Sequence, residues 1–176
     1  MTKSLKSLLE KPQKLEQFIE NKFIDPNCIA ETVKSLKSQG LSIATLNGSF
    51  DLLHAGHLYI LFEAKKTADI LIVALNSDDS IKRYKGAERP IVDLTNRLAL
   101  IASMDWIDYV TFFEEDDPRA LLEKIAPDVH VNGAEYGDNC IEKKTVEACG
   151  GRIHLVDRIE GLSTSSLIKK IKTLCD

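Results

Sequence analysis

Short apolar runs alternate with helical hydrophobic patterns from Leu41 onward, and this alternation restricts the fold more than any other feature of the chain. Strands separated by helices form βαβ units, which place the strands parallel in one sheet with helices on both faces. Ligands of such sheets bind beyond the carboxyl ends of the strands. The sequence therefore predicts an α/β fold with a parallel sheet. The expected strands are Leu41–Leu46, Ile70–Leu75, Tyr109–Phe113, Val129–Val131 and Ile153–Val156.

The segments between and after these strands carry apolar residues at helical spacing. Asp93 and Asp117 are expected to cap two of these helices, because aspartate accepts hydrogen bonds from the first free N–H groups of a helix. The expected helices are Leu58–Ala68, Leu94–Met104, Pro118–Ile125, Ile141–Cys149 and Ser165–Leu174.

Residues 1–40 read as a separate helical extension, followed by one α/β domain over residues 41–176. Asp25 and Pro26 are typical of an N-cap and a first helical position, and Gly40 is a typical helix end. We expect the extension to pack on the domain or on a second subunit. Its apolar stripes are Leu5, Leu8 and Leu9, then Leu15, Phe18 and Ile19, then Ile29, Val33 and Leu36.

Size and charge exclude several classes of protein. The chain has 176 residues, enough for one domain with a real core, and a net charge of −4, which argues against nucleic acid or an anionic membrane as the main partner. No apolar run is long enough to span a bilayer, and no signal-peptide core is found, so we expect a cytoplasmic protein. The four scattered cysteines are expected to be reduced thiols.

The strongest candidate site is the stretch Asn47–His57, which joins an expected strand to an expected helix. His54 and His57 fall at the start of that helix, where free N–H groups and the positive end of the dipole favour phosphate. Gly48 and Gly56 allow a tight turn and a close approach of phosphate to the backbone. Two alternatives are metal binding by Asp51, His54 and His57, and a surface turn that happens to hold two histidines.

Three further stretches follow expected strands. The run Lys82–Pro90 holds four cations and is interpreted as a loop that clamps a triphosphate or a phosphorylated substrate, although a solvated face is the alternative. Residues 158–166 open the last helix with hydroxyl groups that suit either phosphate or ordinary capping. The turn at 132–137 is placed to contact a base or sugar.

Together these residues resemble the H-x-G-H type of nucleotidylyltransferase, the cytidylyltransferase-like superfamily. Residues 48–57 match its first signature, and Arg158 with residues 161–164 looks like its R-x-x-G-x-S-T signature. Within the superfamily the likeness is strongest to the adenylyltransferase half of the bifunctional heptose-phosphate kinase/adenylyltransferases. The resemblance covers residues 41–172 and implies a Rossmann-like, doubly wound five-stranded sheet.

The resemblance implies a reaction in which the phosphate of a sugar 1-phosphate, D-glycero-β-D-manno-heptose 1-phosphate, attacks the α-phosphorus of ATP and releases pyrophosphate. The product would be ADP-heptose for lipopolysaccharide. Mg²⁺ would arrive on the ATP phosphates, with no metal site in the protein, and a homodimer is a further expectation. The implied catalytic residues are His54, His57, Lys85, Ser163 and Thr164; the implied nucleotide-binding residues are Asn47, Gly48, Ser49, Phe50, Gly56, Gly133 and Arg158; the implied acceptor-binding residues are Asp51, Arg89, Arg97 and Asn132.

The chain departs from the resembled family in two ways. It has no sugar-kinase domain, so a stand-alone transferase is expected. The family usually reads Lys-Gly-Gly-Asp-Tyr where this chain has Asn132-Gly133-Ala134-Glu135-Tyr136, which leaves the acceptor open. The alternatives are a cytidylyltransferase that acts on glycerol 3-phosphate or a related polyol phosphate, and a nucleotide-binding protein without catalysis.

Overall fold

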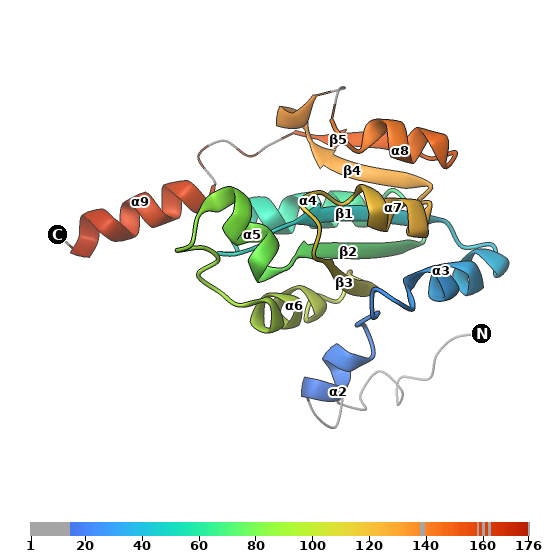
Figure 1. Ribbon diagram of the computed structural model, residues 1–176, viewed down its shortest axis with the longest axis horizontal. Helices are drawn as coiled ribbons and strands as arrows, with labels where there is room; N and C mark the ends of the chain where they lie inside the picture. Colours follow the sequence, from blue (N-terminus) through green and yellow to red (C-terminus); the bar gives the residue numbers. More distant parts are fainter. Residues whose placement is uncertain (1–14, 138–139, 158, 160, 162, 176) are drawn as a thin grey trace.

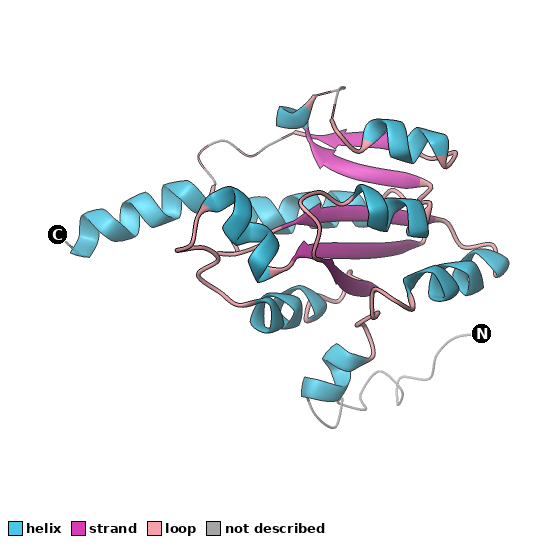
Figure 2. Ribbon diagram, in the orientation of Figure 1, coloured by secondary structure: helices cyan, strands magenta, loops and turns pink. Residues whose placement is uncertain are grey.

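A computed structural model describes residues 15–137, 140–157, 159, 161 and 163–175. It contains a sheet of five parallel strands in the order β3-β2-β1-β4-β5, with helices on both faces (Figures 1 and 2). The predicted Rossmann-like, doubly wound fold class is confirmed, and every predicted strand lies within two residues of an observed one. The strands are β1 Ile43–Gly48, β2 Ile70–Asn76, β3 Tyr109–Phe113, β4 Val129–Gly133 and β5 Arg152–Val156.

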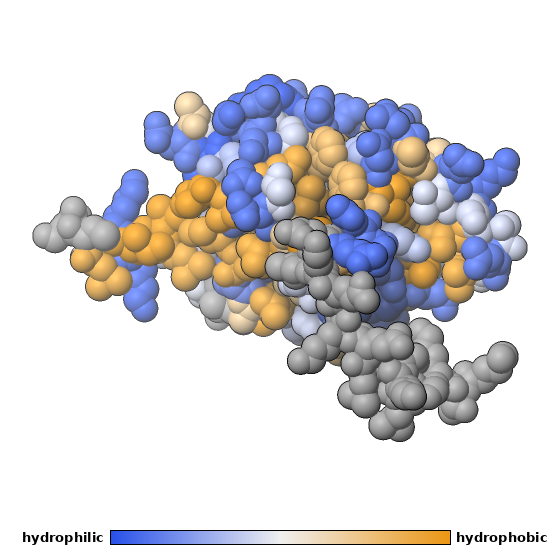
Figure 3. Space-filling view, turned by 90° about the horizontal axis from the view of Figure 1, so that it is seen from below, coloured by the Kyte–Doolittle hydropathy of each residue, from blue (hydrophilic) through white to orange (hydrophobic). Residues whose placement is uncertain are grey.

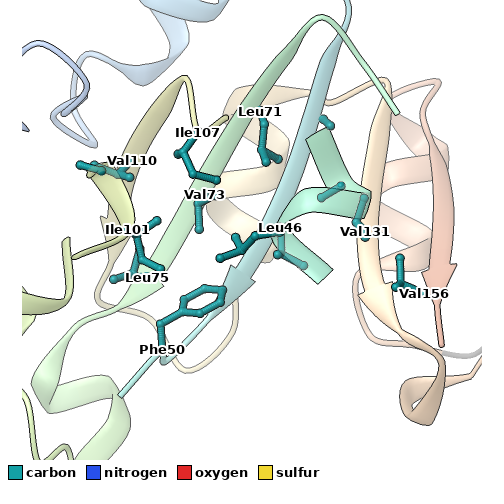
Figure 4. Packing of buried hydrophobic residues seen from close by; sticks show 14 of the residues in the cluster. Leu46, Phe50, Leu71, Val73, Leu75, Ile101, Ile107, Val110, Val131 and Val156 are labelled. Carbon is teal, nitrogen blue, oxygen red and sulfur yellow. The ribbon is translucent and has the colours of Figure 1, made fainter. Parts of the chain in front are cut away.

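The central strands are apolar throughout because both faces of the sheet are covered. Alternate residues of β2 enter two different clusters: Leu71, Val73 and Leu75 pack on one face, whereas Ile72 and Ala74 pack on the other. Figure 4 shows the first cluster, whose labelled residues come from all five strands, from the loop after β1, and from α6 and the segment that follows it.

The helices form two layers. Helices α4 and α6 contact β1, β2 and β3 on one face, while α3, α7 and α8 contact one another or β5 on the other. Asp93 caps α6 as predicted, with Oδ1 accepting the N–H of Asn96 at 3.0 Å. The helices are α2 Leu15–Glu20, α3 Ile29–Ser38, α4 Ala55–Lys65, α5 Asp78–Lys85, α6 Leu94–Ala102, α7 Arg119–Ile125, the 3₁₀ turn η1 Ala134–Tyr136, α8 Lys143–Ala148 and α9 Thr164–Cys175.

Helix α5 was not predicted, and it corrects the interpretation of Lys82–Pro90 as one loop. Ser77 caps the helix through its hydroxyl oxygen, and acidic residues in the first turn with basic residues in the last suit the helix dipole. The run Lys82–Lys85 is therefore the last turn of a helix, and only residues 86–93 form a loop. The helical pattern is weak because Ile81 is its one buried apolar side chain.

The described part of the N-terminal extension packs on the α/β domain. The N–H of Ile24 donates to Val110 O at 2.9 Å and the N–H of Val110 donates to Lys22 O at 2.8 Å, so the chain runs along the edge of β3. Helix α3 begins at Ile29, three residues later than Pro26 predicts, and shares a core cluster with β1 and β2. The stripe Leu5, Leu8 and Leu9 lies outside the described residues, and the domain boundary at 40/41 stays a prediction.

Helix α9 projects from the domain (Figure 1). Apolar side chains gather along it on the face seen from below (Figure 3). Among the α9 side chains, Ile171 is 52% exposed and Leu174 is 77% exposed. No helix among the described residues is both long and apolar enough to cross a membrane. The homodimer stays a prediction.

Buried His130 predicts a loss of stability in acid. Its Nδ1 lies 2.8 Å from the hydroxyl of Thr45, and burial lowers its pKa from 6.5 to about 4. Between these two values the unfolded chain binds a proton that the folded chain does not, so stability falls as the pH drops from 6.5 towards 4. We expect about 3 kcal/mol of the free energy of unfolding to be lost through this group.

Urea unfolding at about pH 7 and pH 4 measures this loss. In His130→Leu the loss should be smaller than in the wild type by about that amount, whereas His154→Leu, on the edge strand β5, should keep it. An equal pH dependence in wild type and His130→Leu would contradict the prediction.

Candidate functional site

The β1–α4 loop is shaped by one aromatic side chain. Phe50 has a φ of +46°, which is unusual for a residue other than glycine, and its ring is buried in the core beside β1. A Cβ atom on Gly48 would lie 3.1 Å from this ring, so a side chain there would push against it. Gly48 is thus needed for the close approach of the loop to Phe50.

His54 and His57 are brought together at the start of α4. His54 is the N-cap residue, His57 lies in the first turn, and their rings stack with centroids 3.8 Å apart and planes 22° apart. The ring of Phe50 meets His57 edge-on at 5.3 Å. The two imidazoles thus lie together beside the N-terminal backbone N–H groups of α4, an arrangement that suits a phosphate group.

Both histidines line a cavity of about 490 Å³ at the carboxyl ends of β1, β4 and β5. The strand order reverses between β1 and β4, and a doubly wound sheet binds its ligands at such a point. The cavity exceeds the one of about 270 Å³ beside β3.

Twelve of the residues predicted for the site line this cavity, although their roles stay predictions. They come from the end of β1 and the loop after it, from the first turn of α4, from the end of α5, from the end of β4 and from the start of α9. They are Asn47, Gly48, Ser49, Phe50, His54, Gly56, His57, Lys85, Asn132, Gly133, Ser163 and Thr164. Arg158 lies outside the described residues.

Arg97 is fully buried and does not line the cavity, which corrects the expectation that it contacts the acceptor. Its side chain is fully buried, and its guanidinium donates to the backbone oxygens of Val92, Ser49 and Asn76 at 2.7–2.9 Å. It also pairs with Asp78 at 2.6 Å. Arg97 therefore ties the loops after β1 and β2 to the start of α5.

Asp51 is corrected in the same way, whereas the role of Arg89 stays a prediction. The carboxylate of Asp51 is fully buried and pairs with Arg89, while its other oxygen accepts the N–H groups of Ile91 and Val92 at 2.8 and 2.9 Å. Asp51 holds the loop after α5 and is not available to a substrate in the cavity. Arg89 does not line the cavity but a second groove, which shares Ser165 with it.

Lys85 reaches the cavity from the end of α5, and its Nζ donates to the hydroxyl of Ser49 at 2.7 Å. Its pKa is lowered chiefly by burial and further by the positive charges of Arg89 and Arg97, against the opposing charge of Asp51. An anionic ligand beside Lys85 would offset these costs.

Asn132 and Gly133 end β4 at the cavity wall. The side-chain amide of Asn132 donates to the buried carboxylate of Glu142 at 3.2 Å, which fixes its orientation. The carboxylate of Glu135 lies so close to Gly133 that a Cβ there would displace it. Asn132, Gly133 and Glu135 stand where the resembled family has a lysine, a glycine and an aspartate.

Ser163 and Thr164 place hydroxyl groups at the start of α9. Ser163 Oγ accepts the N–H of Ser166 at 3.1 Å, as an N-cap residue does, so its capping role is present in this structure. The hydroxyl of Thr164 donates to Leu52 O at 3.4 Å, which links α9 to the histidine loop. The first turns of α4 and α9 therefore both border the cavity.

Sequence reasoning missed several residues of the lining. Tyr59 and Ile60 lie three and four residues after Gly56, and that helical spacing could have found them. Asp157 and Ile159 directly follow β5, where the carboxyl-end rule applies. Glu135, Tyr136 and Ser165 were in stretches already singled out but were not named as site residues.

The alternative interpretation, a metal site made by Asp51, His54 and His57, is not supported by the structure. In the part of the chain that the structure describes, no three His, Cys, Asp or Glu side chains are grouped to hold a metal ion. The carboxylate of Asp51 instead accepts hydrogen bonds from Arg89 and from two backbone N–H groups.

Comparison with known proteins places the chain among nucleotide-transferring enzymes. Residues 45–172 match the family model described as cytidylyltransferase-like. The bifunctional protein HldE of Helicobacter hepaticus is 44% identical over 161 residues, which is 92% of this chain and 32% of that protein. HldE of Geotalea uraniireducens is 42% identical over 148 residues, 84% of this chain and 30% of that protein. The chain thus spans about a third of the length of these curated relatives.

Two solved structures are also similar. The lipopolysaccharide core biosynthesis protein from Thermoplasma volcanium aligns with a TM-score of 0.55 at 30% identity, covering 68% of this chain and 98% of that one. A pantoate-β-alanine ligase from Francisella tularensis aligns with a TM-score of 0.61 at 19% identity, over 84% of this chain and 72% of that one, and shows the fold alone. Since the family model and the relatives both cover most of the chain, the protein belongs to the cytidylyltransferase-like family and is a nucleotidyltransferase.

Proposed function

We propose that this protein transfers AMP from ATP to D-glycero-β-D-manno-heptose 1-phosphate, forming ADP-heptose and pyrophosphate for the lipopolysaccharide core. The observation that carries the transfer chemistry is the stacked His54–His57 pair at the start of α4, facing the cavity at the switch point of the sheet. The choice of acceptor is supported by the HldE relatives and by the lipopolysaccharide core protein of similar structure.

The proposed reaction needs positioning and charge neutralisation more than proton transfer. An oxygen of the acceptor phosphate forms a bond to the α-phosphorus of ATP, the bond to the β-phosphate oxygen breaks, and pyrophosphate leaves. The attacking oxygen is already ionised at neutral pH, so no general base is required. Donors that are fixed where charge grows in the transition state lower the barrier.

The cavity supplies such donors from three directions. His54 and His57 with the N-terminus of α4 would meet the α-phosphate and the departing oxygens. Ser163 and Thr164 at the start of α9 would hold the rest of the triphosphate, and Lys85 would add a positive charge from α5. Mg²⁺ enters this scheme as the ATP complex, that is, as part of the substrate.

Lys85 predicts an alkaline limit to activity. Burial and neighbouring cations lower the pKa of Lys85, so its ammonium group loses its charge at a lower pH than that of an ordinary lysine. We expect kcat/KM for ATP to fall as this charge is lost. In Lys85→Arg the guanidinium stays protonated, so this fall should move to higher pH. Initial rates between about pH 7 and 10 measure the shift. Lys144→Arg, at an exposed position of α8, is the control; an alkaline limb unchanged by Lys85→Arg would contradict the prediction.

Pyrophosphate release tests the function as a whole. Purified protein with Mg²⁺ is given ATP or CTP, each with heptose 1-phosphate or glycerol 3-phosphate. We expect release with ATP and the heptose alone. Release with CTP and glycerol 3-phosphate alone would instead show a cytidylyltransferase, and silence of folded protein in all four mixtures would overturn this reaction and leave nucleotide binding without catalysis as the alternative.

A further inference from the structure

A second groove, of about 420 Å³, lies between α9 and the segment that joins α5 to α6, two parts that run close together in Figure 1. Arg89 lines it from that segment, and one face of α9 lines it from the other side. The α9 residues recur at helical spacing, so they belong to a single face: Ser165, Ile168, Lys169, Lys172 and Thr173.

Like charges converge on this groove. Lys169 and Lys172 lie one turn apart on the α9 face, opposite Arg89, and α9 has no acidic residue. Among the described residues neither lysine takes part in an ion pair. The carboxylate of Asp51 pairs with Arg89, but it is fully buried and lies outside the groove lining. An anion between α9 and Arg89 would relieve the repulsion of the three cations.

The groove adjoins the nucleotide cavity. Ser165 lines both, so the two spaces meet at the first turn of α9. The guanidinium of Arg89, the ammonium groups of the two lysines and the hydroxyl of Ser165 are donors that suit phosphate oxygens. Its position and its charge therefore match a phosphate group of a molecule that also occupies the cavity.

We propose that Arg89, Lys169 and Lys172 form a phosphate-binding subsite that extends the nucleotide cavity along α9. The proposal rests on the proposed function, because its two candidate ligands are a product and a substrate of the proposed reaction. One is the leaving pyrophosphate, which departs on the side of Ser163 and Thr164 and carries the higher charge. The other is the phosphorylated acceptor. Both present the same chemistry to the groove.

Two double variants with the same loss of charge test the subsite. Lys169→Gln/Lys172→Gln removes the groove lysines, while Lys144→Gln/Lys170→Gln removes two exposed lysines that do not line the groove. Binding of inorganic pyrophosphate alone is measured by calorimetry at low ionic strength, and KM for heptose 1-phosphate is measured in turnover. Circular dichroism and thermal unfolding verify that both variants are folded.

We expect the groove variant either to bind pyrophosphate about tenfold more weakly or to have a KM for heptose 1-phosphate that is about tenfold higher. The control variant should leave both values within about twofold of the wild type. A change in pyrophosphate affinity identifies the leaving group as the ligand, and a change in KM identifies the acceptor. The proposal is overturned if neither quantity changes, or if both variants change alike through net charge. Failure of the proposed function is seen separately, as no pyrophosphate release by the wild type with ATP and heptose 1-phosphate.

Discussion

Replacing His57 with alanine is expected to lower turnover by about 10²- to 10⁴-fold while the protein stays folded. The imidazole lies in the first turn of α4, stacked on His54 and braced by Phe50, so its N–H is held in place before the substrate arrives. A donor that is fixed in this way stabilises the charge that grows on phosphate oxygens without further reorganisation. Pyrophosphate release at saturating ATP and acceptor gives the turnover number.

Two comparisons separate chemistry from folding in this experiment. His154→Ala removes a histidine from β5, outside the cavity lining, and should keep turnover within about threefold of the wild type. His57→Asn keeps a side-chain N–H and should recover part of the lost rate. If His57→Ala turned over at nearly the wild-type rate, the roles assigned to the histidine pair would be wrong.

Replacing Arg97 with methionine is expected to cost about 3–5 kcal/mol of the free energy of unfolding. The guanidinium is fully buried and holds three backbone oxygens together with the carboxylate of Asp78. Methionine fills a similar volume but donates no hydrogen bond, so these acceptors lose their partner inside the protein. A loss of this size corresponds to a fall in melting temperature of about 10 °C or more for a chain of this length.

The matched control is Arg152→Met. Arg152 begins the edge strand β5 and is exposed, and its replacement should change the free energy of unfolding by less than about 0.5 kcal/mol. Urea unfolding of both variants measures the difference. Arg97→Lys should also be destabilised, because one ammonium group does not span the acceptors that the forked guanidinium reaches. Equal stability of Arg97→Met and the wild type would show that the loops after β1 and β2 do not depend on this arginine.

The strands and the histidine loop were predictable from the sequence because their signals are local. In β2, a continuous apolar run is what a strand covered on both faces requires, and the run Ile70–Leu75 supplied it. At 47–57, two histidines and the glycines stand between a strand and a helix, so the loop that lines the cavity could be placed by chain order alone. Helix α5 was missed because a short helix with one buried apolar residue, Ile81, has almost no periodic signal.

The roles of Asp51, Arg89 and Arg97 needed the tertiary structure. In the sequence these are charged residues near the ligand edge of the sheet, which is where substrate-binding groups are expected. In the structure Asp51 and Arg97 are buried, and most of the groups to which they bond lie 19–48 residues away along the chain. Burial and long-range pairing are properties of the folded chain, and no local pattern reports them.

The sequence by itself determined the α/β alternation, the parallel sheet and the position of the histidine pair at a helix start, because each depends on residues within a few turns of one another. Only the tertiary structure decided which cations face open space. Lys85 reaches the cavity and Lys169 and Lys172 line the groove, whereas Arg97 is fully buried and bonded to four acceptors. The physical reason is that a cation can bind a ligand only if the fold has not already paired its charge and its hydrogen-bond donors with groups of the protein.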